Sequence, residues 1–122
     1  MRTGSLICVV DDDEEVRESV STFFRSAGIK VVKFGAAEEL LAFPDLAAMD
    51  FLITDLHMPG MDGLELQREL RRQGYHVPVI LMTAFPTVEA REEARQLGIA
   101  AFVAKPTDPE MLLEQVETLL AA

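Results

Sequence analysis

Four aspartates, a threonine and a lysine stand where apolar runs of the chain end. Asp11–Asp13 follow one such run, Asp55 another, and Thr83 and Lys105 each follow a further one. Carboxylates that converge repel one another, and a bound divalent cation relieves the repulsion. Oxygen donors without cysteine or a clear histidine set favour Mg²⁺, with Mn²⁺ as a substitute, over Zn²⁺. A nearby ammonium and hydroxyl suit a phosphoryl group, so these residue types predict metal-assisted phosphoryl transfer to a carboxylate.

Asp55 lies within the stretch Leu52–Gly63, which reads L-I-T-D-L-H-M-P-G-M-D-G. The apolar residues before it predict a buried strand, and the proline and glycines after it predict a loop of defined shape. A carboxylate at the end of a core strand faces the crevice where ligands of such sheets bind. Because aspartate is also common in turns, these residues alone leave open that Asp55 merely caps the loop.

The elements that must carry these side chains alternate along the chain. Apolar, partly β-branched runs predict five strands, at Leu6–Val10, Ile29–Phe34, Asp50–Thr54, Val77–Met82 and Ala100–Ala104. Helical spacing predicts five intervening or terminal helices: Glu14–Ala27, Ala36–Phe43, a third containing Leu64, Leu66 and Leu70, Glu89–Leu97, and a last one that carries Leu112, Leu113, Val116, Leu119 and Leu120. This alternation predicts a doubly wound, parallel α/β domain, so all strands present their carboxyl ends at one edge.

Local signals refine this outline. Lys30 and Lys33 interrupt the second strand, which we therefore place at an edge of the sheet. Thr107, with Glu110 three residues on, predicts a capping box for the last helix. His57 and His76 are too isolated to predict a zinc site, and we expect both to be exposed loop residues.

Composition excludes several classes of protein. The 122 residues are 49% hydrophobic, enough for one folded domain and too many for a disordered chain. A formal net charge of −10 leaves no basic surplus for nucleic-acid binding. The sequence has no apolar segment of membrane-spanning length and no signal-peptide core, so we expect a cytoplasmic protein without membrane contact. The single cysteine, Cys8, stands in an apolar run and is expected to be a core residue.

Four segments together resemble the receiver domain of two-component response regulators. In chain order they are V-V-D-D, T-D-L-H-M-P-G-M-D-G, L-M-T-A and F-V-A-K-P, each at the end of an expected strand. The resemblance covers the chain almost from end to end, and it implies a single receiver domain over residues 1–122. It also implies a flavodoxin-like fold, with a five-stranded parallel sheet in the order 2-1-3-4-5 and five flanking helices.

The resemblance implies a role for each matched acidic position. Asp55 would be the phosphoacceptor and a metal ligand. Asp12 would bind Mg²⁺ directly and Asp11 mainly through water, with the main-chain carbonyl of His57 as a further ligand. Asp13 would instead begin the first helix, where a negative charge is favourable.

The resemblance also assigns the residues that read the phosphoryl group. Lys105 would bind one phosphoryl oxygen, and Thr83 would donate a hydrogen bond to another when the domain switches. Phe102 matches the family's rotating aromatic residue, and the absence of a hydroxyl leads us to expect its ring inward before phosphorylation. The peptide bond between Lys105 and Pro106 would be cis. Phe85, where relatives often carry polar groups, is expected to lengthen the phosphoryl lifetime.

The function implied is that of a phosphoacceptor switch rather than an enzyme with turnover. A sensor histidine kinase or phosphotransfer protein would donate the phosphoryl group. The surface of strand five and its flanking helices would then signal to an output protein or domain, with homodimerisation on phosphorylation as one form of output. Either a single-domain regulator or the receiver part of a longer one fits.

An alternative class is a phosphohydrolase of the haloacid-dehalogenase kind, with Asp11 and Asp13 as its D-x-D pair. It leaves Asp55 unexplained and lacks a later acidic pair for the metal. Turnover of phosphate esters would favour it over the receiver.

Overall fold

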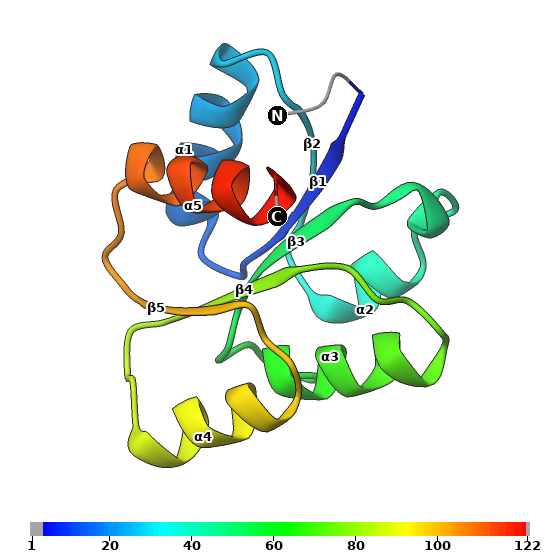
Figure 1. Ribbon diagram of the computed structural model, residues 1–122, viewed down its shortest axis with the longest axis vertical. Coiled ribbons are helices and arrows are strands. Elements are labelled where there is room, and N and C mark those ends of the chain that lie inside the picture. The colour runs from blue at the N-terminus through cyan, green and yellow to red at the C-terminus, as the bar shows by residue number, and fades with distance from the viewer. Residues whose placement is uncertain (1–3, 122) are drawn as a thin grey trace.

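The computed structural model describes residues 4–121, which form a central parallel sheet between two layers of helices (Figure 1). The sheet contains five strands in the order β2-β1-β3-β4-β5. The strands are β1 (Leu6–Val10), β2 (Lys30–Phe34), β3 (Phe51–Asp55), β4 (Val79–Thr83) and β5 (Ala101–Ala104). The expected fold class, strand order and edge position of the second strand are thereby confirmed.

Five α-helices connect or follow these strands, and they lie on both faces of the sheet (Figure 1). They are α1 (Glu14–Ser26), α2 (Ala37–Leu41), α3 (Gly63–Arg72), α4 (Val88–Gln96) and α5 (Pro109–Ala121). A short 3₁₀ turn, Leu46–Ala48, precedes β3 and was not expected from the sequence. Within residues 4–121, none of the helices combines the length and the apolar character needed to span a bilayer.

Each face of the sheet has its own apolar core, because buried β-strands point alternate side chains to opposite faces. On one face, α1 and α5 bury Phe24 and Val116 against Ile7 and Ile53 of the sheet. On the other face, α2 and α3 pack against a second set of strand residues, with α4 covering a smaller third cluster. The strands that carry the polar side chains at their ends are therefore packed against apolar residues on both faces.

Cys8 belongs to the second core and is completely buried in β1. Burial raises the pKa of its thiol to about 12. The expectation that it is a core residue is confirmed, because a thiol in this environment stays protonated and unreactive.

The helix starts confirm one expected cap and correct another. Asp13 caps α1, where its carboxylate accepts hydrogen bonds from the main-chain N–H groups of Glu15 and Val16. The predicted capping box of Thr107 with Glu110 is wrong: α5 begins at Pro109, and Asp108 accepts the Glu110 N–H at 2.9 Å. Proline favours the first helical position because its missing N–H is not needed there, so the residue before it becomes the cap.

The strand boundaries shift by one or two residues from those expected. β3 runs to Asp55 itself, and Asp55 pairs with Met82 of β4. β4 begins at Val79 rather than Val77, since Pro78 has no N–H to donate to a neighbouring strand. The effect is to place Asp55 inside the sheet's regular hydrogen-bonding frame instead of on a free loop.

Candidate functional site

The carboxyl ends of β1, β3 and β5 bring four predicted site residues together. Carboxylate oxygens of Asp11, Asp12 and Asp55 lie within 4.8 Å of one another. The ammonium of Lys105 enters this group, with its Nζ 2.7 Å from Asp11 Oδ2 and 3.4 Å from Asp55 Oδ1. We call these four residues the acidic pocket. Their convergence confirms that the apolar runs deliver them to one edge.

Asp55, the last residue of β3, is largely buried. Only 5% of the residue is exposed. Burial and then the neighbouring charge of Asp11 raise the pKa of Asp55 to about 6, even though Lys105 opposes the shift. The carboxylate is therefore ionised at neutral pH, but its charge is poorly compensated by the residues around it.

Lys105 is the cation that contacts these carboxylates. Burial on its own would lower the pKa of Lys105, but the ion pairs with Asp11 and Asp55 outweigh burial and leave the pKa raised. The main-chain N–H of Lys105 donates to the carbonyl of Thr83 at 2.8 Å, and the Lys105–Pro106 peptide is cis, as expected. A main-chain hydrogen bond thus positions the backbone of Lys105, two ion pairs position its ammonium, and the raised pKa keeps the ammonium charged.

The donor set of the acidic pocket fits a divalent cation. Three carboxylates share the pocket with one ammonium, which contacts two of them, so the pocket has an excess of two formal negative charges. Asp11 is completely buried, and its Oδ2 receives no aligned hydrogen bond besides the ion pair with Lys105. Asp12 is exposed, so it can hold an ion that retains water molecules. Carboxylate oxygens with room for water match the ligand preference of Mg²⁺.

Thr83 ends β4 and is completely buried beside this edge. Its Oγ1 accepts a hydrogen bond of 3.0 Å from the main-chain N–H of Phe85, which leaves the hydroxyl proton free to be donated elsewhere. Phe85 is 71% exposed, and its ring lies edge-on to the ring of His57, with 6.1 Å between the centroids. Both histidines, His57 and His76, are exposed, as predicted.

Phe102 on β5 is half-buried. One side of its ring packs against the cluster that contains Leu81 and Ala94. The guanidinium of Arg91, from α4, lies 4.6 Å from the ring centroid. The structure therefore gives this ring an intermediate position with a cationic partner, and the sequence offered no sign of that partner.

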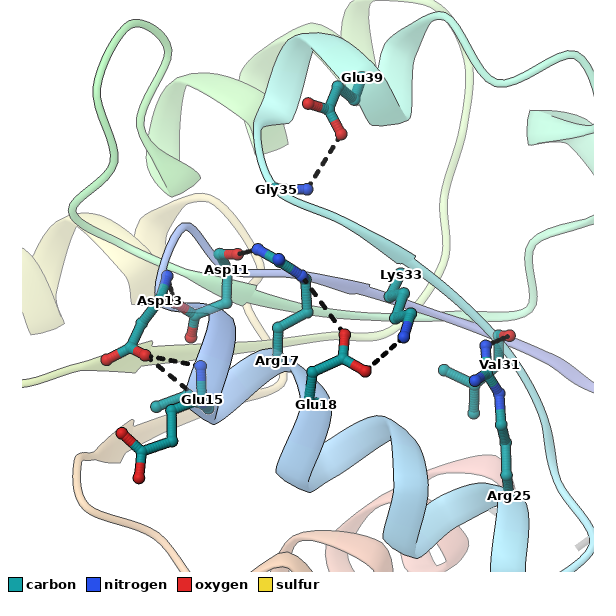
Figure 2. Close-up of polar contacts among 11 residues, drawn as sticks. Asp11, Asp13, Glu15, Arg17, Glu18, Arg25, Val31, Lys33, Gly35 and Glu39 are labelled. Atoms are coloured by element: carbon teal, nitrogen blue, oxygen red, sulfur yellow. Dashed lines mark hydrogen bonds and ion pairs between the residues drawn. The ribbon is translucent and has the colours of Figure 1, made fainter.

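Arg17 is a contributor that the sequence reasoning missed. From α1 its Nη1 donates a 2.8 Å hydrogen bond to the main-chain carbonyl of Asp11, as Figure 2 shows. Further along α1, Glu18 forms an ion pair of 2.5 Å with Lys33 of β2. Arg17 thus binds the backbone at Asp11, next to Asp12, and its Nε also lies 3.9 Å from Glu18 Oε2.

Glu38 is the second missed contributor. Glu38 and Glu39 are both exposed, yet each carboxylate accepts a hydrogen bond from a main-chain N–H. Glu39 accepts from Gly35, next to its own helix (Figure 2), whereas Glu38 reaches across to Met61, at 3.0 Å, in the loop after β3. This hydrogen bond lowers the pKa of Glu38. A contact across 23 residues leaves no local pattern in the sequence.

Comparison with known proteins gives a consistent set of relatives. The family model "Response regulator receiver domain" matches residues 7–117. Nodulation protein W of Bradyrhizobium diazoefficiens is 36% identical over 93% of this chain and 50% of its own length. Transcriptional regulatory protein FixJ of Azorhizobium caulinodans is 38% identical over 92% of this chain and 53% of its own length. The chain therefore spans about half the length of these curated relatives.

Solved structures agree with this fold. Chemotaxis protein CheY4 of Vibrio cholerae superposes with a TM-score of 0.87 at 30% identity, over 94% of this chain and 98% of the other. The structure titled FixJ-N gives a TM-score of 0.85 at 32% identity, over 99% of this chain and 96% of the other. The geometry of the acidic pocket thus occurs on a backbone shared with these proteins.

Proposed function

The chain belongs to the response regulator receiver domain family, whose members are phosphorylated on an aspartate, and we propose that the acceptor in this chain is Asp55. The observation that carries the proposal is the buried Asp55 carboxylate, which shares the acidic pocket with Asp11, Asp12 and Lys105. Asp12 is exposed, so water solvates its carboxylate, and Asp11 is paired with Lys105 at 2.7 Å. Both carboxylates are therefore weaker candidate nucleophiles than that of Asp55.

We propose a direct transfer from a phosphohistidine of a partner protein. An ionised Asp55 oxygen attacks the phosphorus of a phosphohistidine whose other ring nitrogen is protonated. An O–P bond forms, and the P–N bond breaks with its electron pair left on the ring nitrogen, so the ring leaves uncharged. The product is an acyl phosphate on Asp55 and a neutral imidazole. A pKa of about 6 keeps the attacking carboxylate ionised at neutral pH while leaving it weakly solvated.

The residues around Asp55 divide the remaining tasks. A bound Mg²⁺ supplies positive charge that offsets the phosphoryl oxygens, and we propose Asp11, Asp12, Asp55 and the His57 carbonyl as the groups that hold it. Lys105, whose Nζ lies 3.4 Å from Asp55 Oδ1, would bind a phosphoryl oxygen carried by Asp55. Because the proposed product is an acyl phosphate held on Asp55 itself, we propose a switch that is loaded once, with no turnover of phosphate esters.

We propose that Thr83 and Phe102 report the loaded state. The Thr83 hydroxyl has an unused proton that a phosphoryl oxygen can accept. Phe102 packs against the cluster that contains Leu81 and Ala94 and lies under Arg91 of α4, and β4 pairs with β5 along their lengths. A move of Thr83 at the end of β4 would therefore be passed to the surface formed by β5 and α4. A sensor kinase or phosphotransfer protein on the input side and an output protein or domain are the partners that the family implies, and phosphorylation-dependent dimerisation is one form of that output.

The experiment that tests the acceptor is intact-mass spectrometry after incubation with Mg²⁺ and a small acyl phosphate. We expect one added phosphoryl group in the parent and none in Asp55→Asn. Asp45→Asn, which alters an exposed aspartate after α2, should be labelled like the parent. Full labelling of Asp55→Asn would reject Asp55 as the acceptor, and steady hydrolysis of phosphate esters would reject the switch.

A further inference from the structure

The loop between β3 and α3, residues 56–62, is attached to the rest of the molecule at few points. Its base is closed by the Gly63 N–H, which donates to the Leu56 carbonyl at 2.9 Å. Met58 is buried in the core cluster that also contains Ala37 and Leu40 of α2. Within residues 4–121, the main chain of residues 57–61 has one hydrogen bond in this structure, from the Met61 N–H to Glu38 Oε2.

The carboxylate of Glu38 fits against the loop closely. Gly60 has a φ of +76°, which side chains rarely adopt. A Cβ built at Gly60 would lie 2.6 Å from Glu38 Oε2, so glycine leaves room for the carboxylate as well as for the backbone turn. Glu38 therefore lies against the Gly60–Met61 peptide and accepts a hydrogen bond from its N–H. The contact needs both the carboxylate of Glu38 and the absence of a side chain at Gly60.

We propose that Glu38 is a positioning residue for the phosphoacceptor site, acting through the loop that connects Asp55 to α3. The inference rests on the proposed function, because the loop carries the His57 carbonyl that we assign to the metal. Met58 anchors the loop by packing and Glu38 anchors it by a charge-assisted hydrogen bond, and Pro59 between them has a fixed φ. With both anchors in place the loop has one shape, and the His57 carbonyl has one direction.

Glu39 provides a matched control on the same short helix. Its carboxylate also accepts a main-chain N–H, at 3.0 Å, but from Gly35 rather than from the loop. Glu38→Ala and Glu39→Ala remove the same charge and the same kind of hydrogen bond one residue apart. Glu38→Gln removes the charge but keeps an oxygen that can accept from Met61.

The test is a calorimetric Mg²⁺ titration of these three variants and the parent, without any phosphodonor. Loss of a group that hydrogen-bonds to a metal ligand typically weakens metal binding 10- to 100-fold. We expect the lower value, about tenfold, for Glu38→Ala, because Glu38 binds the loop at Met61 and not the His57 carbonyl itself. Glu38→Gln should recover most of the affinity, and Glu39→Ala should bind like the parent. Hydrogen exchange of the Met61 amide should be faster in Glu38→Ala alone.

Two results would overturn the proposal. One is Mg²⁺ affinity in Glu38→Ala equal to that in Glu39→Ala, which would limit Glu38 to a structural contact. The other is an equal loss in Glu38→Ala and Glu38→Gln, which would mean that charge rather than position is responsible. Both are distinct from a failure of the proposed function, which would appear as phosphoryl labelling of Asp55→Asn whatever the Glu38 variants do.

Discussion

Replacing Asp55 by asparagine should stabilise the metal-free protein at neutral pH. The folded state raises the pKa of Asp55 from 3.8 to about 6, a change of roughly two units that already includes the attraction of Lys105. Each unit corresponds to about 1.4 kcal/mol, so the ionised carboxylate costs about 3 kcal/mol of folding free energy. Asparagine has a similar shape and carries no charge, and it removes this cost.

The sign of the pH dependence follows from the direction of the shift. A carboxyl with a raised folded-state pKa stabilises the fold when protonated, fully below its unfolded pKa near 4. That contribution is lost as pH rises through about 6. The advantage of Asp55→Asn should therefore be about 3 kcal/mol at pH 7.5 and about half as large at pH 5.0.

Urea unfolding followed by circular dichroism at both pH values, with a chelator present, measures this difference. Asp45→Asn serves as the control, and its stability should differ little from that of the parent at either pH, because Asp45 is exposed. Adding Mg²⁺ at pH 7.5 should narrow the gap, since an ion that binds the folded parent stabilises it by mass action. An Asp55→Asn protein no more stable than the parent at pH 7.5, or a gap independent of pH, would refute the electrostatic reasoning.

Four further predictions concern the neighbours of Asp55. Asp12→Ala should lose most of its Mg²⁺ affinity in a calorimetric titration, and undiminished binding would rule out a direct ligand. Lys105→Ala should still bind Mg²⁺, yet show a much smaller phosphorylation-dependent change in its NMR spectrum than the parent; a full response would contradict its role. Phe85→Glu should shorten the phosphoryl half-life, by about tenfold at most because the position is so exposed, and an unchanged or longer half-life would count against it. Arg91→Gln should remove about 0.5–1 kcal/mol of cation–π attraction and shift the Phe102 ring equilibrium by about two- to fivefold, read from aromatic NMR couplings; an unchanged ring would disprove the contact's influence.

The arrangement of the acidic pocket could be predicted because it depends on topology. Once Asp11, Asp55 and Lys105 are seen to stand at the carboxyl ends of strands in one parallel sheet, they are expected at the same edge. The exact sheet boundaries were less accessible, since the pairing of Asp55 with Met82 depends on register rather than on composition.

The capping boxes show how local signals compete. Asp62 and Glu65 form a reciprocal capping box at α3 that the sequence analysis passed over, although the spacing is visible in the sequence. Thr107 and Glu110 have the same spacing, but Pro109 sets the start of α5 one residue later. A proline at the first helical position is thus a stronger signal than a threonine before it.

The contacts of Arg17 and Glu38 could not be predicted from local patterns. Besides a long ion pair of 3.9 Å with Glu18, Arg17 donates to the main-chain carbonyl of Asp11, a partner that the charge pattern of α1 does not reveal. Glu38 meets Met61 only because α2 and the loop after β3 lie side by side in the folded chain. In the sequence both residues resemble ordinary surface charges. Their hydrogen bonds form only because the folded chain brings their helices next to the partner groups.

The burial of Cys8 makes its thiol a chemical probe of how often the sheet opens. It is the only cysteine in the sequence, lies completely inside β1, and has a thiol pKa raised to about 12. A thiol reagent can modify it only when the strand between β2 and β3 is opened. The rate of Cys8 modification therefore measures how often the centre of the sheet opens, and a second cysteine placed on the surface could carry a dye without competition from the first.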